Sequence, residues 1–461
     1  MKTDYFLQIT DVFNHAFHNL GLDVRQEVLE SLTHTIHQAM SLKGRYYHTC
    51  EHALTLSDPQ NPIQSLAALF HDVVNYPVDQ GFSPDVWQGI ASYLGPCQED
   101  EAQIRFVEHV PVDDSGFHLV REIFGFSCGQ TLFSTSGYNE ILSSLVMAKK
   151  LEQIVPQKVL LQSICYIEAS IPFRPRDENE VGPFEGLADR LGKVARNYHI
   201  LISEGEIEKT IQGAVTFANQ DVENFTACET SLFLDNTWKL LAESNPALRR
   251  GSVYSLRDYR QALHGMKDFL CSIVAQDVLH EFKGLPPRAE IQEQLIQVRK
   301  NLTTGCGYLE IKLLTIAILE ALAEITGGDA PVALFLGKGE QTAQAKRLLG
   351  GYIFPARTPA AGVDTKGDLV KLLKSGRIEP VDDTDVKTSP LALYIYQGMG
   401  FEKVQSALGY AYQMFAGQME PAEFLQVLDP SMLAVIAEAC AHMTPERREK
   451  LLAYAMEKLD S

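Results

Sequence analysis

The sequence predicts an all-α protein, and three observations support this fold class. Between Asp4 and Met40 the apolar residues recur at spacings of three and four, which is the pattern of amphipathic helices. Similar patterns return through most of the later chain, and a short strand is favoured only at residues 332–336. No internal repeat is evident, so a solenoid is not expected.

The chain has 461 residues, which is long enough for two or more domains. We expect a first domain over residues 1–274 and a mostly helical second domain of unknown role over residues 285–461, because glycine and prolines gather at 283–288. Residues 77–137 lose the helical regularity, with helix-like pieces at 86–94 and 103–109. We interpret them as an insertion or lid in the first domain.

Composition limits the classes of partner. The formal net charge is -19 and the isoelectric point is near 5.1, which argues against a nucleic-acid polymer because phosphate contacts need clustered Lys and Arg. A small phosphorylated substrate drawn to a bound metal ion is compatible with this charge, since the ion reverses the local field.

Cysteines and apolar segments indicate the compartment. The eight cysteines form no close pairs, so we expect neither a zinc ribbon nor a disulfide framework, but reduced and mostly buried thiols. Residues 1–17 lack the apolar core of a signal peptide, and charged residues interrupt the most apolar segment, 308–325. These features favour a cytoplasmic protein without a membrane partner.

The most informative stretch reads YYHTCEHALTLSDPQNPIQSLAALFHDVVNY, from Tyr46 to Tyr76. His48 and His52 are four residues apart, which on a helix places both imidazoles on one face. His71 and Asp72 follow at the end of an apolar run. Because a carboxylate is rarely buried without a charged partner, and a divalent cation is a suitable one, the stretch is a candidate metal site.

The joint pattern resembles the HD superfamily of metal-dependent phosphohydrolases, in particular a bacterial branch with Tyr-His-x-x-x-His and Phe-His-Asp-x-Val-Tyr-like motifs. The matching residues are Tyr47, His48, His52, Phe70, His71, Asp72 and Val74, with Tyr76 one place late because Asn75 intervenes. The resemblance implies a helical HD bundle in the first domain and a ligand set that includes His52, His71 and Asp72.

The resemblance also implies a late aspartate that completes the ligand set. We expect Asp221 in this role, because it follows an apolar helix and is flanked by the polar residues Asn219 and Asn224. Glu223 is a weaker substitute two positions away. The alternative for Asp221 is a helix N-cap without any ligand.

Two glutamates compete for a catalytic position near the metal. Glu140, with Asn139 and Ser143, matches a family motif, but well over fifty residues later than expected. Glu168 lies in the last turn of a predicted helix that Pro172 ends, where a carboxylate opposes the helix dipole unless a positive charge lies opposite it. A metal ion would supply that charge, and so would the nearby Arg174 and Arg176 in a plain salt bridge.

A site of His52, His71, Asp72 and Asp221 suits Mn, Fe, Zn, Co or Ni, with Mg less well matched to two imidazoles, and one or two ions are compatible. The resemblance implies hydrolysis of a phosphate ester, in a nucleotide or another small molecule, by a metal-activated water. In the resembling proteins, the counterpart of His48 is a general acid or a further metal ligand. Asp72 would orient the water.

The remaining positions concern the substrate. Arg174 and Arg176 are candidates to bind its phosphate, because a planar guanidinium pairs well with that group. Tyr47 and Tyr76 are expected to form pocket walls. Two other interpretations stay open: an HD-type di-iron oxygenase, and a non-catalytic metal-binding or ligand-binding module. The sequence is compatible with an oligomer.

Overall fold

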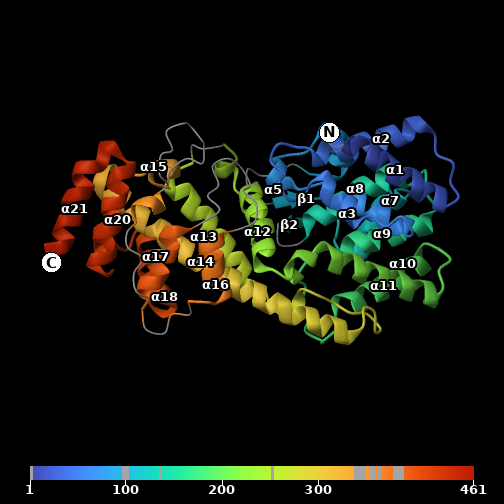
Figure 1. Ribbon diagram of the computed structural model, residues 1–461. Helices are drawn as coiled ribbons and strands as arrows, with labels where there is room; N and C mark the ends of the chain where they lie inside the picture. Colours follow the sequence, from blue (N-terminus) through green and yellow to red (C-terminus); the bar gives the residue numbers. More distant parts are fainter. Residues whose placement is uncertain are drawn as a thin grey trace. The chain divides into compact units, whose positions relative to one another are not determined.

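A computed structural model describes residues 4–95, 103–133, 137–250, 254–336, 349–353, 359–360, 363, 365–376 and 389–460. Over these ranges the chain is helical almost throughout, and its one sheet there has two short strands (Figure 1). The predicted all-α class is confirmed. No helix in the described ranges is both long enough and apolar enough to cross a membrane.

The chain divides into two compact units. Unit 1 consists of Met1–Thr226 together with Val274–Ile296, and unit 2 consists of Ala227–Ile273 together with Gln297–Ser461. The expected boundary at 274–285 therefore differs from the observed division, because the chain enters unit 2 at residue 227 and returns to unit 1 for residues 274–296.

Unit 1 is built mainly from helices, whose bounds are α1 Tyr5–Asn19, α2 Gln26–Met40, α3 Cys50–Leu56, α4 Pro62–Phe70, α5 Tyr76–Asp79, α6 Pro84–Ile90, α7 Ser115–Phe124, α8 Tyr138–Leu151, α9 Gln157–Ala169, α10 Pro183–Asn197 and α11 Glu204–Asp221. Helix α4 is central. It starts with an Asn61 cap and Pro62, and every residue from Gln64 to Phe70 is buried. A helix that is buried all round must be covered on several sides, and α4 packs against α1, α3, α8 and α9.

Residues 77–137, the predicted insertion, contain α6, α7 and the strands β1 Gln103–Arg105 and β2 Thr131–Phe133, which pair antiparallel. The predicted helix at 103–109 is wrong. Ile104 and Phe106 are buried while Arg105 between them is exposed, which is the alternation of a strand. Helix α7 packs against α8, α9 and α10, so this segment contributes to the core of unit 1.

Unit 2 contains α12 Thr230–Ser244, α13 Leu256–Ser272, most of α14 Arg288–Gly327, α15 Val332–Leu336, α16 Asp368–Ser375, α17 Pro390–Met399, α18 Phe401–Phe415, α19 Pro421–Gln426, α20 Pro430–Met443 and α21 Arg448–Asp460. The predicted strand at 332–336 is wrong, because this segment is helix α15. Its buried residues Val332 and Phe335 are three positions apart, which fits one face of a helix.

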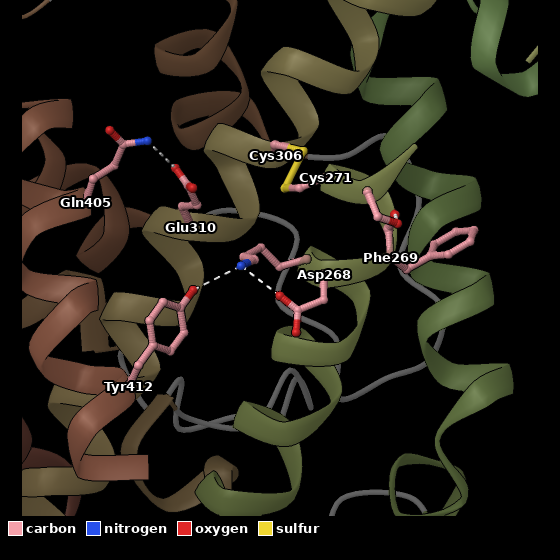
Figure 2. Close-up of a disulfide and its surroundings, with 9 residues drawn as sticks. Asp268, Phe269, Cys271, Cys306, Glu310, Gln405 and Tyr412 are labelled. Carbon is pink, nitrogen blue, oxygen red and sulfur yellow. Dashed lines mark hydrogen bonds and ion pairs between the residues drawn. A yellow bond between two sulfur atoms is a disulfide. The ribbon is translucent and has the colours of Figure 1, made fainter. Parts of the chain in front are cut away.

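The expectation of reduced thiols is also wrong at one pair. Cys271 near the end of α13 and Cys306 in α14 form a disulfide, with their Cα atoms 5.8 Å apart (Figure 2). Figure 2 also shows Glu310, one turn beyond Cys306, which accepts a hydrogen bond from Gln405 of α18 at 3.2 Å. The two cysteines are 35 positions apart in sequence, so only the packing of the two helices brings them together.

Residues 274–296 are joined to unit 1 by specific contacts. The backbone N–H of His280 donates to Oδ1 of Asn219, and Nδ2 of Asn219 donates back to the His280 carbonyl, both at 2.9 Å. Phe282 is 4% exposed within the core of unit 1, and Lys283 pairs with Glu208 of α11 at 2.8 Å. The returning segment is therefore part of the fold that carries the candidate site.

Candidate metal centre

Three helix ends bring the predicted ligands together. His52 lies in the first turn of α3, His71 is the C-cap residue directly after α4, and Asp221 is the last residue of α11. Near Asp221, the side chain of Gln64 in α4 donates to that of Gln220 in α11 at 2.8 Å, which holds the end of α11 against α4. Residues far apart in sequence therefore meet at one point.

The donor atoms of the four residues lie close to one another. The Nε2 atom of His52 is 3.0 Å from Oδ1 of Asp221 and 3.6 Å from Oδ2 of Asp72. The Nε2 atom of His71 is 2.8 Å from Oδ2 of Asp72 and 3.7 Å from Oδ1 of Asp221. His52, His71 and Asp72 offer donor atoms within 4.8 Å of one another, as a shared metal ion requires.

These distances fit the edges of a coordination shell. Donors about 2.1 Å from a transition metal are about 3.0 Å apart in an octahedron and about 3.4 Å apart in a tetrahedron. The four nitrogen-to-oxygen distances, from 2.8 to 3.7 Å, cover this range. The side chains of His52, Asp72 and Asp221 are 14–17% exposed, whereas that of His71 is 1% exposed.

In both imidazoles, the ring nitrogen Nε2 makes no hydrogen bond. Although carboxylate oxygens are near, Nε2 of His52 and Nε2 of His71 are buried and make no hydrogen bond of acceptable geometry. In His71, Nδ1 lies 2.8 Å from the Ala68 carbonyl and donates to it, which leaves the lone pair of a neutral ring on Nε2. This tautomer is the one that a metal-binding histidine needs.

The electrostatics of the cluster are those of closely opposed charges. Burial works against ionisation of Asp72 and Asp221, but the neighbouring histidines outweigh it, lowering the pKa of Asp72 and bringing that of Asp221 to about 2. Burial likewise opposes protonation of His71, while the two aspartates raise its pKa well above the ordinary value. The two carboxylates are therefore ionised at neutral pH and ready to bind a cation.

Arg45 is a residue that the sequence analysis did not single out for the site. Its side chain is fully buried and forms an ion pair with Asp79 at 2.6 Å. The same guanidinium donates to the backbone carbonyls of Asp72 at 2.6 Å, His48 at 3.4 Å and Val73 at 3.5 Å. The sequence feature that could have drawn attention to Arg45 is its position directly before Tyr46-Tyr47-His48. An arginine that is buried there must pair with groups close by.

Asn139 and Ser143, which match the late motif of the resembling proteins, contact the segment that follows His71 and Asp72. Oδ1 of Asn139 accepts from the backbone N–H of Tyr76, and Oγ of Ser143 accepts from that of Val74, both at 3.1 Å. Both residues belong to the first turns of α8. Burial, together with the charges of Asp72 and Asp221, raises the pKa of Glu140 in the same helix to about 7. The structure thus brings Glu140 near the cluster despite its distance in sequence.

His48 precedes α3 instead of sharing a helix with His52, so the expected one-turn spacing does not apply to this pair. The two rings are still 5.9 Å apart, because the chain turns at this point. The ring of Tyr47 packs beside both, with its centre 4.9 Å from that of His48 and 5.2 Å from that of His52. Nδ1 of His48 is 3.4 Å from the side-chain amide of Asn75.

Glu168, Arg174 and Arg176 form a different group. Glu168 is buried and pairs with Arg174 at 2.7 Å and with Arg190 at 2.5 Å, which supplies the positive charge that its helix position needs. Arg176 donates to the Glu180 carbonyl at 2.8 Å. Arg174 and Arg176 both line a cavity that none of the four metal-ligand candidates lines.

Comparison of the chain with protein-family models, with curated proteins and with solved structures finds no match. The site and the fold therefore provide the grounds for a functional proposal.

Proposed function

We propose that unit 1 is a metal-dependent phosphohydrolase of the HD type, in which His52, His71, Asp72 and Asp221 hold a divalent transition metal. The observation that carries this proposal is the pair of buried Nε2 atoms without hydrogen bonds, both beside the same two carboxylates. Two imidazoles and two carboxylates favour Mn, Fe, Zn, Co or Ni over Mg.

The mixed ligand set suits hydrolysis of a small phosphate ester. When bound, such a metal supplies an activated water near neutral pH and neutralises charge on a phosphoryl group. Asp72 would orient the water, and the buried carboxylate of Glu140, which interacts with Asp72 and Asp221, would accept a proton from it. Whether one or two ions bind follows from a direct metal count.

The neighbouring residues have supporting roles in this proposal. His48, beside the cluster, donates a proton to the leaving oxygen or serves as a further ligand. Tyr47 fixes the rings of His48 and His52 by its contacts with both. Glu168 stays outside the reaction, because both of its oxygens are engaged by Arg174 and one also by Arg190.

The test combines metal content with hydrolysis. Untagged protein purified without chelators is examined by elemental mass spectrometry, and activity is measured with p-nitrophenyl phosphate and bis-p-nitrophenyl phosphate as monoester and diester probes. We expect one or two equivalents of a transition metal, turnover that a chelator abolishes, and loss of both metal and turnover in Asp72→Asn.

A matched control comes from the pair of His34, which is exposed, and Asp85, which is partly buried; their Nδ1 and Oδ2 atoms are 3.1 Å apart. Asp85→Asn should leave metal content and turnover unchanged. Metal binding without turnover of either ester would favour the non-catalytic module, and iron with oxygen consumption would favour the oxygenase. Absence of metal even after incubation with Mn or Zn would refute the proposal.

A further inference from the structure

A cavity in unit 1 is lined by three arginines and three acidic residues. It has a volume of about 210 Å³ and lies between the loop that carries Arg174 and Arg176 and the returning segment that carries His280 and Arg288. Three guanidinium groups therefore line one small space. This volume is below the range of about 300–1,000 Å³ of pockets for drug-sized ligands, so the cavity suits a small ion or the charged end of a larger molecule.

Two of the three guanidiniums are available for a ligand. Arg174 is held by Glu168 and by Phe184, whose ring centre is 5.9 Å away. Arg176 makes a single hydrogen bond to a backbone carbonyl, and Arg288 is exposed. Within the described part of the chain, neither Arg176 nor Arg288 forms an ion pair with a carboxylate.

The backbone adds to this positive field. Helix α10 starts at Pro183 without a side-chain cap, and Gly182, Pro183 and Phe184 all line the cavity. Helix α14 starts at Arg288. The first turn of a helix carries partial positive charge and unpaired N–H groups, so both helix starts reinforce the guanidiniums.

The cavity also has acceptors that need a donor. Glu185, Asp277 and Glu281 line it, and Oε2 of Glu281 is buried with no hydrogen-bond partner. His280 cannot serve as a cation here, because burial and the charges of Arg174 and Arg176 lower its pKa to about 4. A ligand that fits must therefore accept from the arginines and donate to a carboxylate.

We infer that this cavity binds a small phosphate-type anion carrying a hydroxyl group, with the anion between Arg176 and Arg288 and the hydroxyl donating to Glu281. Hydrogen phosphate and the phosphate monoester of a small polyol share this chemistry. Sulfate has the charge but no hydroxyl at neutral pH. The inference does not rest on the proposed metal chemistry, because no metal-ligand candidate lines the cavity.

The experiment is isothermal titration calorimetry on full-length, chelator-treated protein, so that a metal ion cannot bind the anion. The probes are inorganic phosphate, glycerol 2-phosphate and sulfate. We expect at least one phosphate probe to bind more tightly than sulfate. Tighter binding of inorganic phosphate would identify the free ion as the ligand, and tighter binding of glycerol 2-phosphate would identify a polyol phosphate monoester. Arg288→Gln and Arg176→Gln should each weaken binding about tenfold or more, because each removes charged hydrogen bonds.

The matched control is Arg299→Gln, since Arg299 is an exposed arginine on the same helix α14 and does not line the cavity. It should bind as the wild type does. Glu281→Gln should reduce the preference for phosphate over sulfate, because an amide offers a donor where the carboxylate offered an acceptor. Circular dichroism checks that each variant is folded.

Three outcomes would overturn the inference. One is the absence of binding of both phosphate and glycerol 2-phosphate at concentrations up to about 10 mM. A second is equal weakening by Arg299→Gln, which would indicate a non-specific charge effect. The third is loss of binding in Asp72→Asn with retention in Arg288→Gln, which would place the anion at the metal-ligand cluster instead.

Discussion

The guanidinium of Arg45 donates to the backbone carbonyl of Asp72 at 2.6 Å, while its other edge pairs with the carboxylate of Asp79. One buried side chain thus joins the start of the histidine motif to the end of the His-Asp pair. A planar guanidinium carries five donors spread over two edges, whereas a lysine ammonium has three donors on a single atom and cannot reach acceptors on both sides in this way. Arg45 therefore fixes the backbone from which Asp72 projects.

Arg45→Lys should lower both stability and metal affinity although it keeps the charge, because the fork that holds the Asp72 carbonyl is lost. Arg45→Gln should be worse, since breaking a buried ion pair by removing one partner costs about 3–5 kcal/mol. Thermal unfolding and metal titration measure the two effects. Arg105→Lys is the control, because Arg105 pairs with Glu108 at the surface and should change neither quantity.

Glu140 and Glu168 should separate cleanly by mutation. Glu140→Gln is expected to reduce turnover by 10²-fold or more, on the order of a lost general base, with little effect on stability. Glu168→Gln is expected to leave the rate per folded molecule unchanged but to destabilise unit 1, because two arginines lose a buried partner. Steady-state kinetics and urea unfolding of both variants test this, and the reverse pattern would exchange their roles.

His280 should make stability depend on acid pH. Its pKa is about 4 in the folded protein, below the ordinary value of 6.5, so the folded state binds this proton less readily than the unfolded state. The free energy of unfolding is therefore unaffected by this histidine above pH 6.5, and it declines as the pH falls toward 4 because the unfolded state binds the proton first. Urea unfolding over this range should show a shallower decline in His280→Gln than in the wild type. His34→Gln, which changes an exposed histidine, should keep the wild-type slope.

The disulfide should stabilise unit 2. A bridge between residues 35 positions apart is worth up to about 4 kcal/mol by loop entropy. Dithiothreitol, or Cys306→Ser, should lower the unfolding temperature in calorimetry under otherwise equal conditions. Cys228→Ser should behave as the wild type, because Cys228 is an exposed free thiol. A thiol count that shows Cys271 and Cys306 reduced in untreated protein would contradict the prediction.

Local spacing was sufficient for part of this structure. The helices and the His-Asp pair at the end of an apolar run follow from patterns within a few turns of chain, whereas Asp221 at the end of α11 was sought because the family resemblance implies a late aspartate. Short segments were harder. Residues 103–105 and 332–336 have apolar residues that fit either a strand or a helix, and only their tertiary neighbours decide between the two.

Long-range pairings were beyond the sequence for a different reason. Asp79 lies 34 positions from Arg45, and Cys306 lies 35 positions from Cys271, so no local period connects either pair. Glu168 illustrates the same limit. Its helix position indicated that a positive charge was needed, but a metal ion and an arginine satisfied that requirement equally until packing placed Arg174 and Arg190 beside it.

The return of residues 274–296 to unit 1 has a consequence for synthesis on the ribosome. When the last residue of α11 leaves the exit tunnel, Phe282 and the His280 backbone that pairs with Asn219 have yet to be made. Unit 1 cannot finish folding until the intervening part of unit 2 has emerged. A nascent chain therefore exposes apolar surface of this core during about 70 further residues of translation. Such surface is what a chaperone binds.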